Sequence, residues 1–456
     1  MRKQPAVEQD SSGQIAYSEH VNPQWARLLT LLQMNADYVE CRGEKLRTSD
    51  GRTILDFLSG YCVHNLGHNH PRVVAELHDE LDRNGPAMLQ SHVAATAGEL
   101  AAKLCARAGA RLNKVYFANS GSEGVETAIK FARAHTGRNG LLAARGAFHG
   151  LTCGALALMD HGFWSDGFGP MLPGVEFVKF GDIAAIEKQL ATRQFAALIL
   201  EPIQGEAGIV LPPRNYLEHA QELCKKYGTL FVLDEVQTGL GRTGRFLAAH
   251  HYGLDPDMVI LAKALSGGLV PVGAVLMTDS IYGSVFNSLR RAIVHTSTYS
   301  ENGLAMRAGL AALDVLDSEA LAERALIQGA EFRGALSQAL APHEMVDEVR
   351  GIGHFSGIAF RPPRSLRLRL SYEAFHRIHP AMFGQIIVMR LFRDHGILTQ
   401  ICGNNFMVLK AAPPLNVRGE SLHTFIRALA DVLEAVHSSK HFWQDALELA
   451  GRAIKV

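Results

Sequence analysis

The sequence predicts an α/β protein, with a large domain around a mostly parallel sheet and a smaller α+β domain after it. Between Val115 and Met277, short apolar runs alternate with helical patterns, as in a parallel sheet whose strands are joined by helices. The apolar runs are almost continuous, which is typical of strands that are covered on both faces. Beyond residue 340, strand and helix patterns are mixed, which indicates a separate, smaller domain.

Six apolar runs are the expected strands of the large sheet. They are Val115–Ala118, Gly140–Ala144, Ala196–Glu201, Leu230–Asp234, Met258–Ala262 and Gly273–Met277. A helix is predicted over Tyr216–Tyr227, because its apolar residues fall on one face. A second helix is predicted to begin near Asn302, where Met306, Leu310 and Leu313 recur at helical spacing.

These patterns divide the chain into three parts. We expect a large domain over residues 61–335 and a small C-terminal domain over 336–456. Residues 1–60 show weak periodicity and are expected to pack on the small domain or on a partner subunit. Residues 361–377 contain five arginines, which we interpret as a solvated hairpin or linker, with an anion-binding patch as the alternative.

Composition narrows the class of protein. Among the 456 residues, Lys+Arg and Asp+Glu each number 45, and this balance argues against a nucleic-acid or membrane-surface role. The N-terminal residues are polar and lack a signal-peptide core, and we find no apolar run long enough for a membrane span. The six scattered cysteines are typical of reduced thiols. We therefore expect a cytoplasmic enzyme.

The first chemical motif follows the strand that ends at Ala118. Ser120 and Glu123 have the spacing of a capping box at the start of a helix. Free N–H groups at such a start bind phosphate, and Gly121 and Ser122 are the expected donors. A capped helix without any ligand would account for this segment equally well.

Two further motifs suggest contacts to a flat, charged ring. Phe148, followed by His149, comes after a strand, where an aromatic side chain can stack on a heterocycle or serve only for packing. Asp234 and Glu235 end a buried strand, at the edge where open α/β sheets bind ligands. A buried carboxylate there needs a cationic partner, and a protonated pyridine nitrogen would serve. Gln237 lies close enough to bond a ring substituent.

Lys263 ends the strand that begins at Met258 and precedes a turn with two glycines. Partial desolvation at a strand end lowers the pKa of a lysine and leaves a nucleophile that can form a Schiff base. The glycines allow the backbone to approach a ligand closely.

Two other patterns are given a structural interpretation. Gly239-Leu-Gly-Arg-Thr-Gly244 has the glycine spacing of a dinucleotide-binding loop, but the segment after it is too short for the crossover helix and the expected acidic residue is absent. His64, His68 and His70 lie in a turn without carboxylate or cysteine at ligand spacing, so we expect no metal site.

Together these segments resemble the class III (subgroup II) pyridoxal-phosphate aminotransferases of fold type I. The resemblance covers nearly the whole chain and depends on an ordered set of motifs. They are DFLSGYCVHNLGHNHP, NSGSEGVETAIKFAR, AFHG, LILEPIQGEAGIVLPP, LFVLDEVQTGLGRTGRF, ILAKALSGG and TSTYSENGLA.

The resemblance implies a role for each matching residue. Lys263 would form the Schiff base with pyridoxal 5′-phosphate, and Asp234 would keep the pyridine nitrogen protonated. Ser120, Gly121 and Ser122 would hold the phosphate, while Phe148, His149 and Gln237 would contact the ring. Thr298 would reach the phosphate of the neighbouring subunit, which implies a homodimer with shared active sites. The implied reaction moves an amino group from a donor amine to a carbonyl acceptor in two half-reactions.

The substrate positions implied by the resemblance are Tyr61, Leu151, Glu201, Glu206 and Lys410. Two of them depart from relatives that use ornithine or acetylornithine, because those relatives carry arginine where this chain has Leu151 and Lys410. A lysine lacks the bidentate fork that grips a carboxylate. We therefore expect an apolar wall at Leu151, a Glu206–Lys410 pair, and a terminal amine or diamine as donor. The alternatives are an ornithine, acetylornithine or 4-aminobutyrate aminotransferase, an aminomutase, and a non-catalytic cofactor-binding protein.

Overall fold

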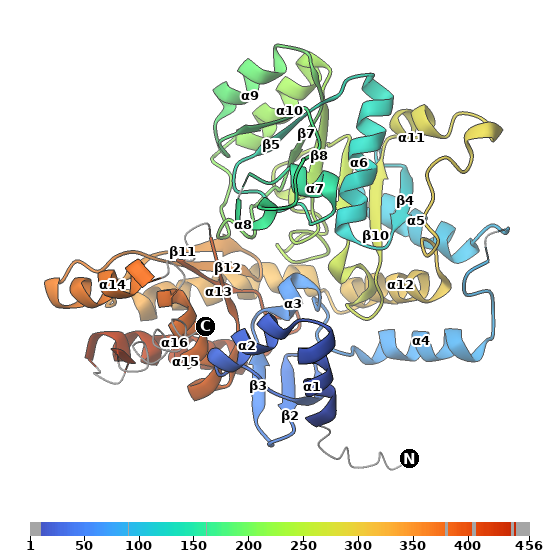
Figure 1. Ribbon diagram of the computed structural model, residues 1–456. Helices are drawn as coiled ribbons and strands as arrows, with labels where there is room; N and C mark the ends of the chain where they lie inside the picture. The colour runs from blue at the N-terminus through green and yellow to red at the C-terminus, as the bar shows by residue number, and fades with distance from the viewer. Residues whose placement is uncertain are drawn as a thin grey trace.

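The structure is a computed structural model that describes residues 11–89, 91–160, 162–378, 382–403, 407–438 and 442–443. A seven-stranded sheet forms the centre of its upper half (Figure 1). In sheet order the strands are β4 (Lys114–Ala118), β10 (Gly273–Met277), β9 (Met258–Leu261), β8 (Leu230–Asp234), β7 (Phe195–Leu200), β5 (Gly140–Ala144) and β6 (Val175–Val178). Strand β10 runs antiparallel to both of its neighbours, β4 and β9, and the other paired strands of this sheet are parallel. The predicted mostly parallel sheet is confirmed, with each predicted strand end within one residue.

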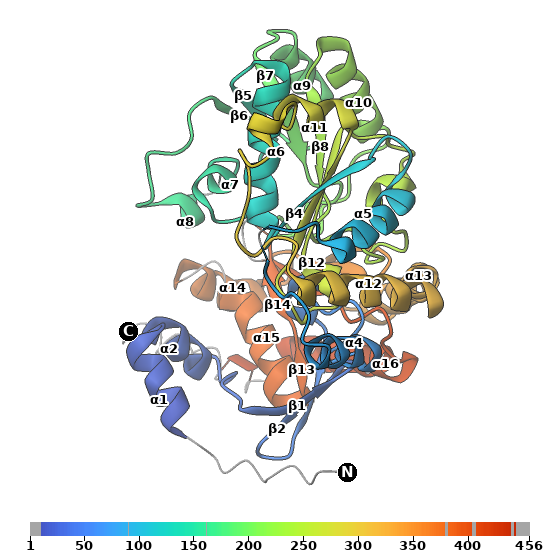
Figure 2. The same ribbon diagram turned by 90° about the vertical axis from the view of Figure 1, so that its right-hand side faces the viewer.

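Helices cover both faces of this sheet, as the continuous apolar strands predict. On one face, α6 (Gly121–Thr136) packs Val125 and Phe131 against the strands. The opposite face is covered by α5 (Ala95–Ala108), α10 (Tyr216–Tyr227) and α12 (Gly303–Ser318). Figure 2 shows α5 and α6 on opposite sides of the strands. The helix predicted over Tyr216–Tyr227 is confirmed, and Asn302 is the N-cap of α12.

The lower half contains two four-stranded sheets and shares one apolar core. The first has the order β1 (Tyr38–Arg42), β2 (Lys45–Thr48), β3 (Thr53–Asp56) and β13 (Ile397–Leu398). The second has the order β11 (Val346–Ile352), β12 (Phe355–Phe360), β15 (Val408–Ala411) and β14 (Gln400–Cys402). Packed on them are α13 (Leu321–Leu340), α15 (Met382–His395) and α16 (Gly419–Ser438). Because β3 pairs in parallel with β13, the N-terminal segment completes a sheet of this half.

Helix α13 connects the two halves. Leu321 and Ala325 belong to an apolar cluster with α12, whereas Leu336 and Leu340 belong to the core of the lower half. The expected domain boundary at 335/336 therefore falls inside a continuous helix.

The arginine-rich segment differs from its prediction. Residues 366–378 form helix α14 (Leu366–Ile378), and a hairpin or linker over 361–377 is wrong. Leu368 and Tyr372, four positions apart, are both buried, and this apolar spacing accounts for the helix.

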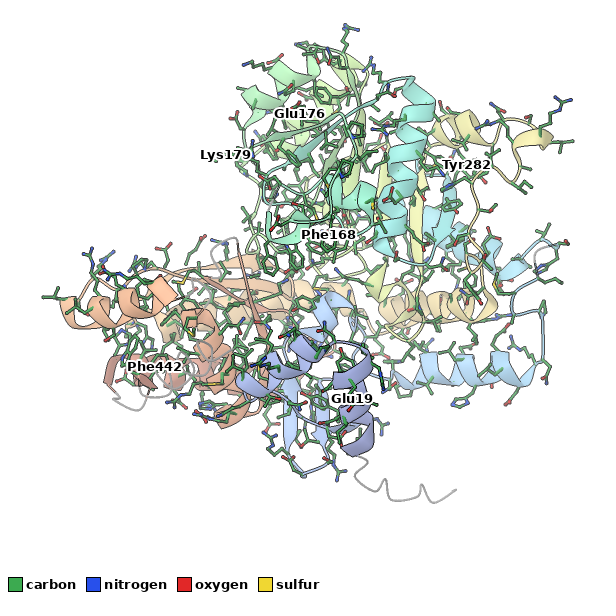
Figure 3. The ribbon with its side chains drawn as sticks, viewed as in Figure 1. Glu19, Phe168, Glu176, Lys179, Tyr282 and Phe442 are labelled. Carbon is green, nitrogen blue, oxygen red and sulfur yellow. The ribbon has the colours of Figure 1, made fainter. Side chains whose placement is uncertain are left out.

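The remaining elements are short helices and connections. They are α1 (Ser11–His20), α2 (Pro23–Leu31), α3 (Ser59–Cys62), α4 (Pro71–Asp82), α7 (Cys153–Ala157), α8 (Gly162–Ser165), α9 (Ile183–Leu190), α11 (Asp279–Val285), η1 (Ala248–His251), η2 (Lys263–Ser266) and η3 (Leu289–Arg291). Figure 3 shows the side chains on this frame, with buried Phe442 inside the lower half and exposed Phe168 at the lower edge of the upper half. Among the described helices, none has the length and apolarity that a membrane crossing requires.

Candidate active site

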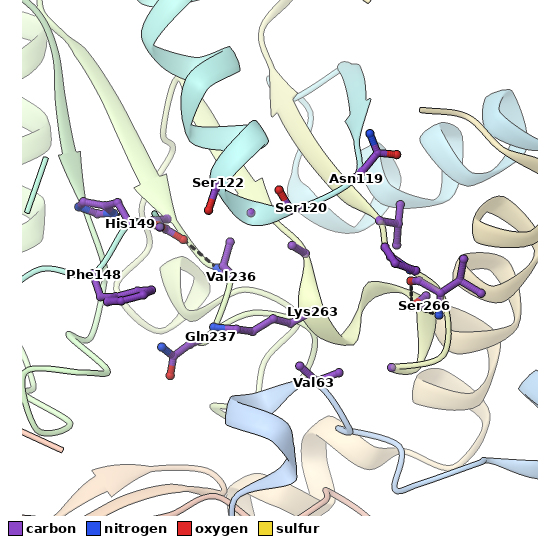
Figure 4. A pocket seen from close by; sticks show the side chains of 18 of the residues that line it. Val63, Asn119, Ser120, Ser122, Phe148, His149, Val236, Gln237, Lys263 and Ser266 are labelled. Atoms are coloured by element: carbon purple, nitrogen blue, oxygen red, sulfur yellow. Dashed lines mark hydrogen bonds and ion pairs between the residues drawn. The ribbon is translucent and has the colours of Figure 1, made fainter. Parts of the chain in front are cut away.

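A cavity of about 450 Å³ lies at the carboxyl ends of β7, β8 and β9, next to the N-terminus of α6 (Figure 4). Its volume falls in the range of roughly 300–1,000 Å³ that small-molecule sites occupy. The lining includes every motif residue predicted for the cofactor in this chain except Thr298. These residues are Ser120, Gly121, Ser122, Phe148, His149, Asp234, Gln237 and Lys263.

The start of α6 has the geometry of an anion site. The Ser120 side chain accepts a hydrogen bond from the Glu123 amide at 3.1 Å, as the capping box predicts. The Glu123 carboxylate turns back one residue further than the motif prescribes and accepts from the Asn119 amide at 2.8 Å. A Cβ on Gly121 would lie 3.0 Å from Val236, so only glycine fits without displacement. The amides of Gly121 and Ser122 have no acceptor in the described chain and remain available to a phosphate.

The Phe148–Gly150 loop is fixed against α6 and β7. The Phe148 amide donates to Glu201 at 3.0 Å, and its ring makes an edge contact with Trp164, with ring centres 5.3 Å apart. A Cβ on Gly150 would overlap the Ser122 hydroxyl, so the loop can pass this close only with glycine. Figure 4 shows the Phe148 ring at the side of the cavity, where a flat ligand can stack on it.

Three titratable side chains form a buried network below the cavity. His149 Nδ1 lies 2.9 Å from the Asp234 carboxylate, and His149 Nε2 has no hydrogen-bond partner in the described residues. Burial raises the pKa of Glu201 to about 7, against the opposing charge of His149. Burial alone would lower the pKa of His149, but the bond to Asp234 and the carboxylate charges outweigh it and raise that pKa. The Asp234–His149 pair can therefore hold a proton under the cavity.

The two acidic residues at the end of β8 have different surroundings. Asp234 lines the cavity and accepts a hydrogen bond from the Val236 amide at 3.1 Å (Figure 4). Glu235 is fully buried and does not line the cavity, although burial raises its pKa to about 7. Its donors are the Thr238 hydroxyl and the amides of Ala248 and Ala249. The expectation that a buried carboxylate at this strand end needs a cationic partner thus does not hold for Glu235, which neutral donors satisfy.

Lys263 has the position and the pKa of a nucleophile. It follows β9 directly, in the left-handed backbone region at φ 47°, and its side chain extends toward Gln237 (Figure 4). Burial lowers its pKa below the usual value. None of the described residues accepts a hydrogen bond from its amine. An amine held in this way is free to attack a carbonyl carbon.

The predicted pair of Glu206 and Lys410 lies beside Gln237. Lys410 Nζ is 2.5 Å from Glu206 Oε1, and Gln237 Nε2 donates to the same oxygen at 3.0 Å. The Lys410 ammonium also lies 5.2 Å from the centre of the Tyr61 ring. Burial alone would raise the pKa of Glu206, but the charge of Lys410 outweighs it and keeps that pKa low. Tyr61, Glu206 and Lys410 are therefore brought together at one corner of the site.

Five predicted residues do not line the cavity of their own chain. Tyr61, Glu206 and Lys410 adjoin it through Gln237, whereas Leu151 and Thr298 do not belong to that group. The Leu151 side chain is 54% exposed and does not line the cavity, so the apolar wall expected there is not formed by Leu151 within one chain. Thr298 is exposed, in the segment after η3, and is also absent from the lining.

Sequence reasoning missed part of the lining and the partners of the turn histidines. The cavity is also lined by Val63, Val236 and the turn at residues 268–272. The apolar residues that follow the glycines of that turn are the sequence feature that could have indicated this part of the lining. His68 Nε2 bonds Asp56 at 2.7 Å, and His70 Nε2 bonds Glu319 at 3.1 Å. Within the described residues, no group of three or more His, Cys, Asp or Glu could hold a metal ion.

These residues fit pyridoxal phosphate. Unpaired amides and a glycine that cannot carry a Cβ form an anion cradle, a buried carboxylate faces the same cavity, and a lysine with a lowered pKa extends into it. The cofactor needs those three features, for its phosphate, its pyridine nitrogen and its aldehyde.

Comparison with known proteins agrees with this geometry. The protein-family model for class-III aminotransferases matches residues 30–433. The chain is 36% identical over 437 residues to a putrescine aminotransferase of Pectobacterium atrosepticum, covering 93% of this chain and 88% of that protein. It is 33% identical over 449 residues to the aminotransferase PigE of a Serratia species, with 92% of this chain covered, and it spans about half (53%) of that protein's length. Among solved structures, the ornithine aminotransferase of Toxoplasma gondii, which holds pyridoxal phosphate at partial occupancy, superposes with a TM-score of 0.79 at 27% identity, covering 94% of this chain and 99% of the other.

Proposed function

This chain belongs to the class-III aminotransferase family, and from that premise we propose that its donor is an aliphatic amine or diamine that reacts at a terminal amino group. The chain is a pyridoxal-phosphate-dependent aminotransferase of fold type I. Its site residues divide into those that move a proton, those that hold the cofactor and those that select the substrate.

When bound, pyridoxal phosphate supplies an aldehyde that takes up the amino group and a ring that stores electrons. Lys263 would hold the cofactor through that aldehyde. The Lys263 amine, when free, would carry a proton between the carbon next to the donor nitrogen and the cofactor side. Its lowered pKa makes the unprotonated amine available for this step.

The other residues hold the cofactor in position. Asp234, bonded to His149, would stabilise a proton on the pyridine nitrogen. Ser120, Gly121 and Ser122 bind the phosphate at the start of α6. Phe148 would contact the ring face, and Gln237 would bond the ring oxygen.

The proposed class of substrate depends on one observation: in the described part of the chain, no arginine lines the cavity. A carboxylate of the substrate would therefore meet no guanidinium fork. Lys410, the cation at the corner, is fully buried and already paired with Glu206. The carboxylate of an α-amino acid would therefore add little binding free energy here, and an alkyl amine, which has no carboxylate, would lose none by its absence. An ornithine, acetylornithine or 4-aminobutyrate aminotransferase would need a carboxylate anchor in addition.

The test compares substrates under one carbonyl acceptor. We expect kcat/KM for putrescine or cadaverine to exceed the values for ornithine, acetylornithine and 4-aminobutyrate by roughly ten- to hundredfold, the usual cost of a missing charge-assisted contact. A preference for acetylornithine or 4-aminobutyrate would contradict the proposal. Product analysis separates an aminomutase, which needs no second carbonyl substrate.

We also propose that the active unit is a homodimer in which Thr298 reaches the phosphate in the partner subunit. Leu289 and Ile293, in the same segment, are 96% and 78% exposed, as apolar side chains at a subunit contact would be in a single chain. Mixing inactive Lys263→Ala protein with inactive Thr298→Glu protein should restore activity, since one site of each heterodimer is then sound. A fully active monomer in sedimentation would contradict this assembly.

The proposed compartment is the cytoplasm. All six cysteines are free thiols, and Cys62, Cys224 and Cys402 are buried. Cell fractionation with an antibody tests this placement, and recovery from an oxidising compartment would contradict it.

A further inference from the structure

Glu206 has an oxygen that the protein leaves unused. Its Oε1 accepts hydrogen bonds from both Lys410 and Gln237, whereas no described residue donates to its Oε2. Next to it, Gln237 Oε1 is buried and has no hydrogen-bond partner in the described part of the chain. Glu206 adjoins the cavity of Lys263 through Gln237, whose side chain lines that cavity.

The charge that this corner exposes is negative. In the Glu206–Lys410 pair, the Lys410 side chain is 0% exposed and the Glu206 side chain is 22% exposed. An incoming charged group therefore meets the carboxylate and not the ammonium. The two lone pairs of a carboxylate oxygen that carries no donor attract an N–H group, and a cationic one most strongly.

We propose that Glu206, through its Oε2, binds the distal ammonium of a diamine whose other amine would take the place of Lys263 on the cofactor. This inference rests on the proposed function and adds the group that selects diamines among terminal amines. Glu206 is thereby a specificity-determining residue.

The pair is also fixed in place. If the Glu206 carboxylate swung away, it would leave the Lys410 ammonium buried without a counter-ion, which is strongly unfavourable. The Tyr61 ring on Lys410 and the Gln237 amide on Glu206 hold the two groups further. A substrate ammonium on Oε2 lies nearer to the carboxylate than to Lys410, which bonds the opposite oxygen, so attraction exceeds repulsion.

The test uses two amines of the same size. 1,4-Diaminobutane and 1-aminopentane have the same number of heavy atoms and differ only in a distal ammonium or methyl group. We expect the holoenzyme to favour the diamine in kcat/KM, mainly through KM. In Glu206→Gln, the ratio of the two kcat/KM values should fall by roughly ten- to hundredfold, toward one.

Two further variants control for charge and folding. Glu206→Gln leaves Lys410 unpaired, so Glu206→Gln/Lys410→Met removes both charges and should show the same fall in the ratio. Glu187→Gln also breaks a Glu–Lys pair, with Lys226 on the surface, and should keep the wild-type ratio. Cofactor absorbance shows whether each variant is loaded.

Each outcome decides between the proposals. A diamine preference that survives in both Glu206 variants overturns this inference. Equal use of the two amines by the wild type also overturns it, while the proposed terminal-amine function stands. If the wild type uses neither amine, the proposed function fails as well.

Discussion

The cofactor end and the substrate end of the cavity are assembled in different ways. At the cofactor end, Ser120, Asp234 and Lys263 follow three strands of one sheet, and each belongs to a contiguous motif. At the substrate end, Glu206 comes from a loop after β7 and Lys410 from a strand of the other half of the molecule. The proposed chemistry would thus depend on one sheet edge, whereas the proposed selectivity would depend on segments outside that sheet.

Each end has one buried lysine, Lys263 at the cofactor end and Lys410 at the substrate end. The strongest test of the comparison is therefore which of the two lysines holds the cofactor. Lys263→Ala should lower kcat by roughly 10³–10⁴-fold, because it removes the proton-transferring amine. Borohydride reduction of the holoenzyme followed by peptide mapping should label Lys263. Label on Lys410 would show that the two lysines have been assigned to the wrong ends.

The second largest effect is expected at Asp234. Asp234→Ala should reduce kcat on the order of 10³-fold, since the ring loses the carboxylate that stabilises its proton. Asp234→Glu should keep part of the rate. Near-normal turnover of the alanine variant would show that the cofactor end does not depend on this charge.

Glu201 and Glu235 sharpen the comparison, because burial raises the pKa of both to about 7 but only Glu201 lines the cavity. A raised folded-state pKa means that the stabilising proton is fully bound below pH about 4.5 and is lost as the pH rises through 7. Either Glu→Gln variant should reduce the fall in unfolding free energy between pH 5 and 8, by at most about 1.4 kcal/mol per pH unit. The pKa of His149 is also raised, so His149 contributes a fall in unfolding free energy with rising pH of the same sign, and both variants keep that contribution.

The two variants should differ in activity. Only Glu201→Gln should change the pH dependence of kcat/KM, since Glu201 lies beside the Asp234–His149 pair. An altered activity profile in Glu235→Gln would mean that the second carboxylate also acts on the cavity.

The smallest effect is expected at Leu151. Because its side chain is largely exposed and outside the lining, Leu151→Ala should change the unfolding free energy by no more than about 0.5 kcal/mol. Its kcat/KM for putrescine should remain within about threefold of wild type. A larger loss would place Leu151 against the substrate in the assembled enzyme.

The cofactor end was largely predictable from sequence because strand, turn and functional residue are adjacent in the chain. The S-x-x-E spacing identified the start of α6, and the apolar runs located six strands. Strand β6 was missed, since it is an edge strand in which only Val178 is buried.

The remaining differences arise from contacts between distant residues. Two of the three donors of Glu235 are the amides of residues 248 and 249, and the nearby Thr238 alone gave no sign that Glu235 turns away from the cavity. For Leu151, the motif fixes the backbone of the loop but not the direction of the side chain. The pairing of Glu206 with Lys410 could be expected from family resemblance, but the burial that leaves only the carboxylate accessible required the three-dimensional structure.

The pairing of β3 with β13 has a consequence for synthesis on the ribosome. Leu55 emerges early, but its partner Ile397 is made only near the end of translation, tens of seconds later at roughly 5–20 residues per second. All seven strands of the large sheet emerge in that interval, so this sheet can form first. Until Ile397 appears, the nascent chain must carry Ile54 and Phe57 without their final core, which makes the N-terminal segment a natural client for chaperones.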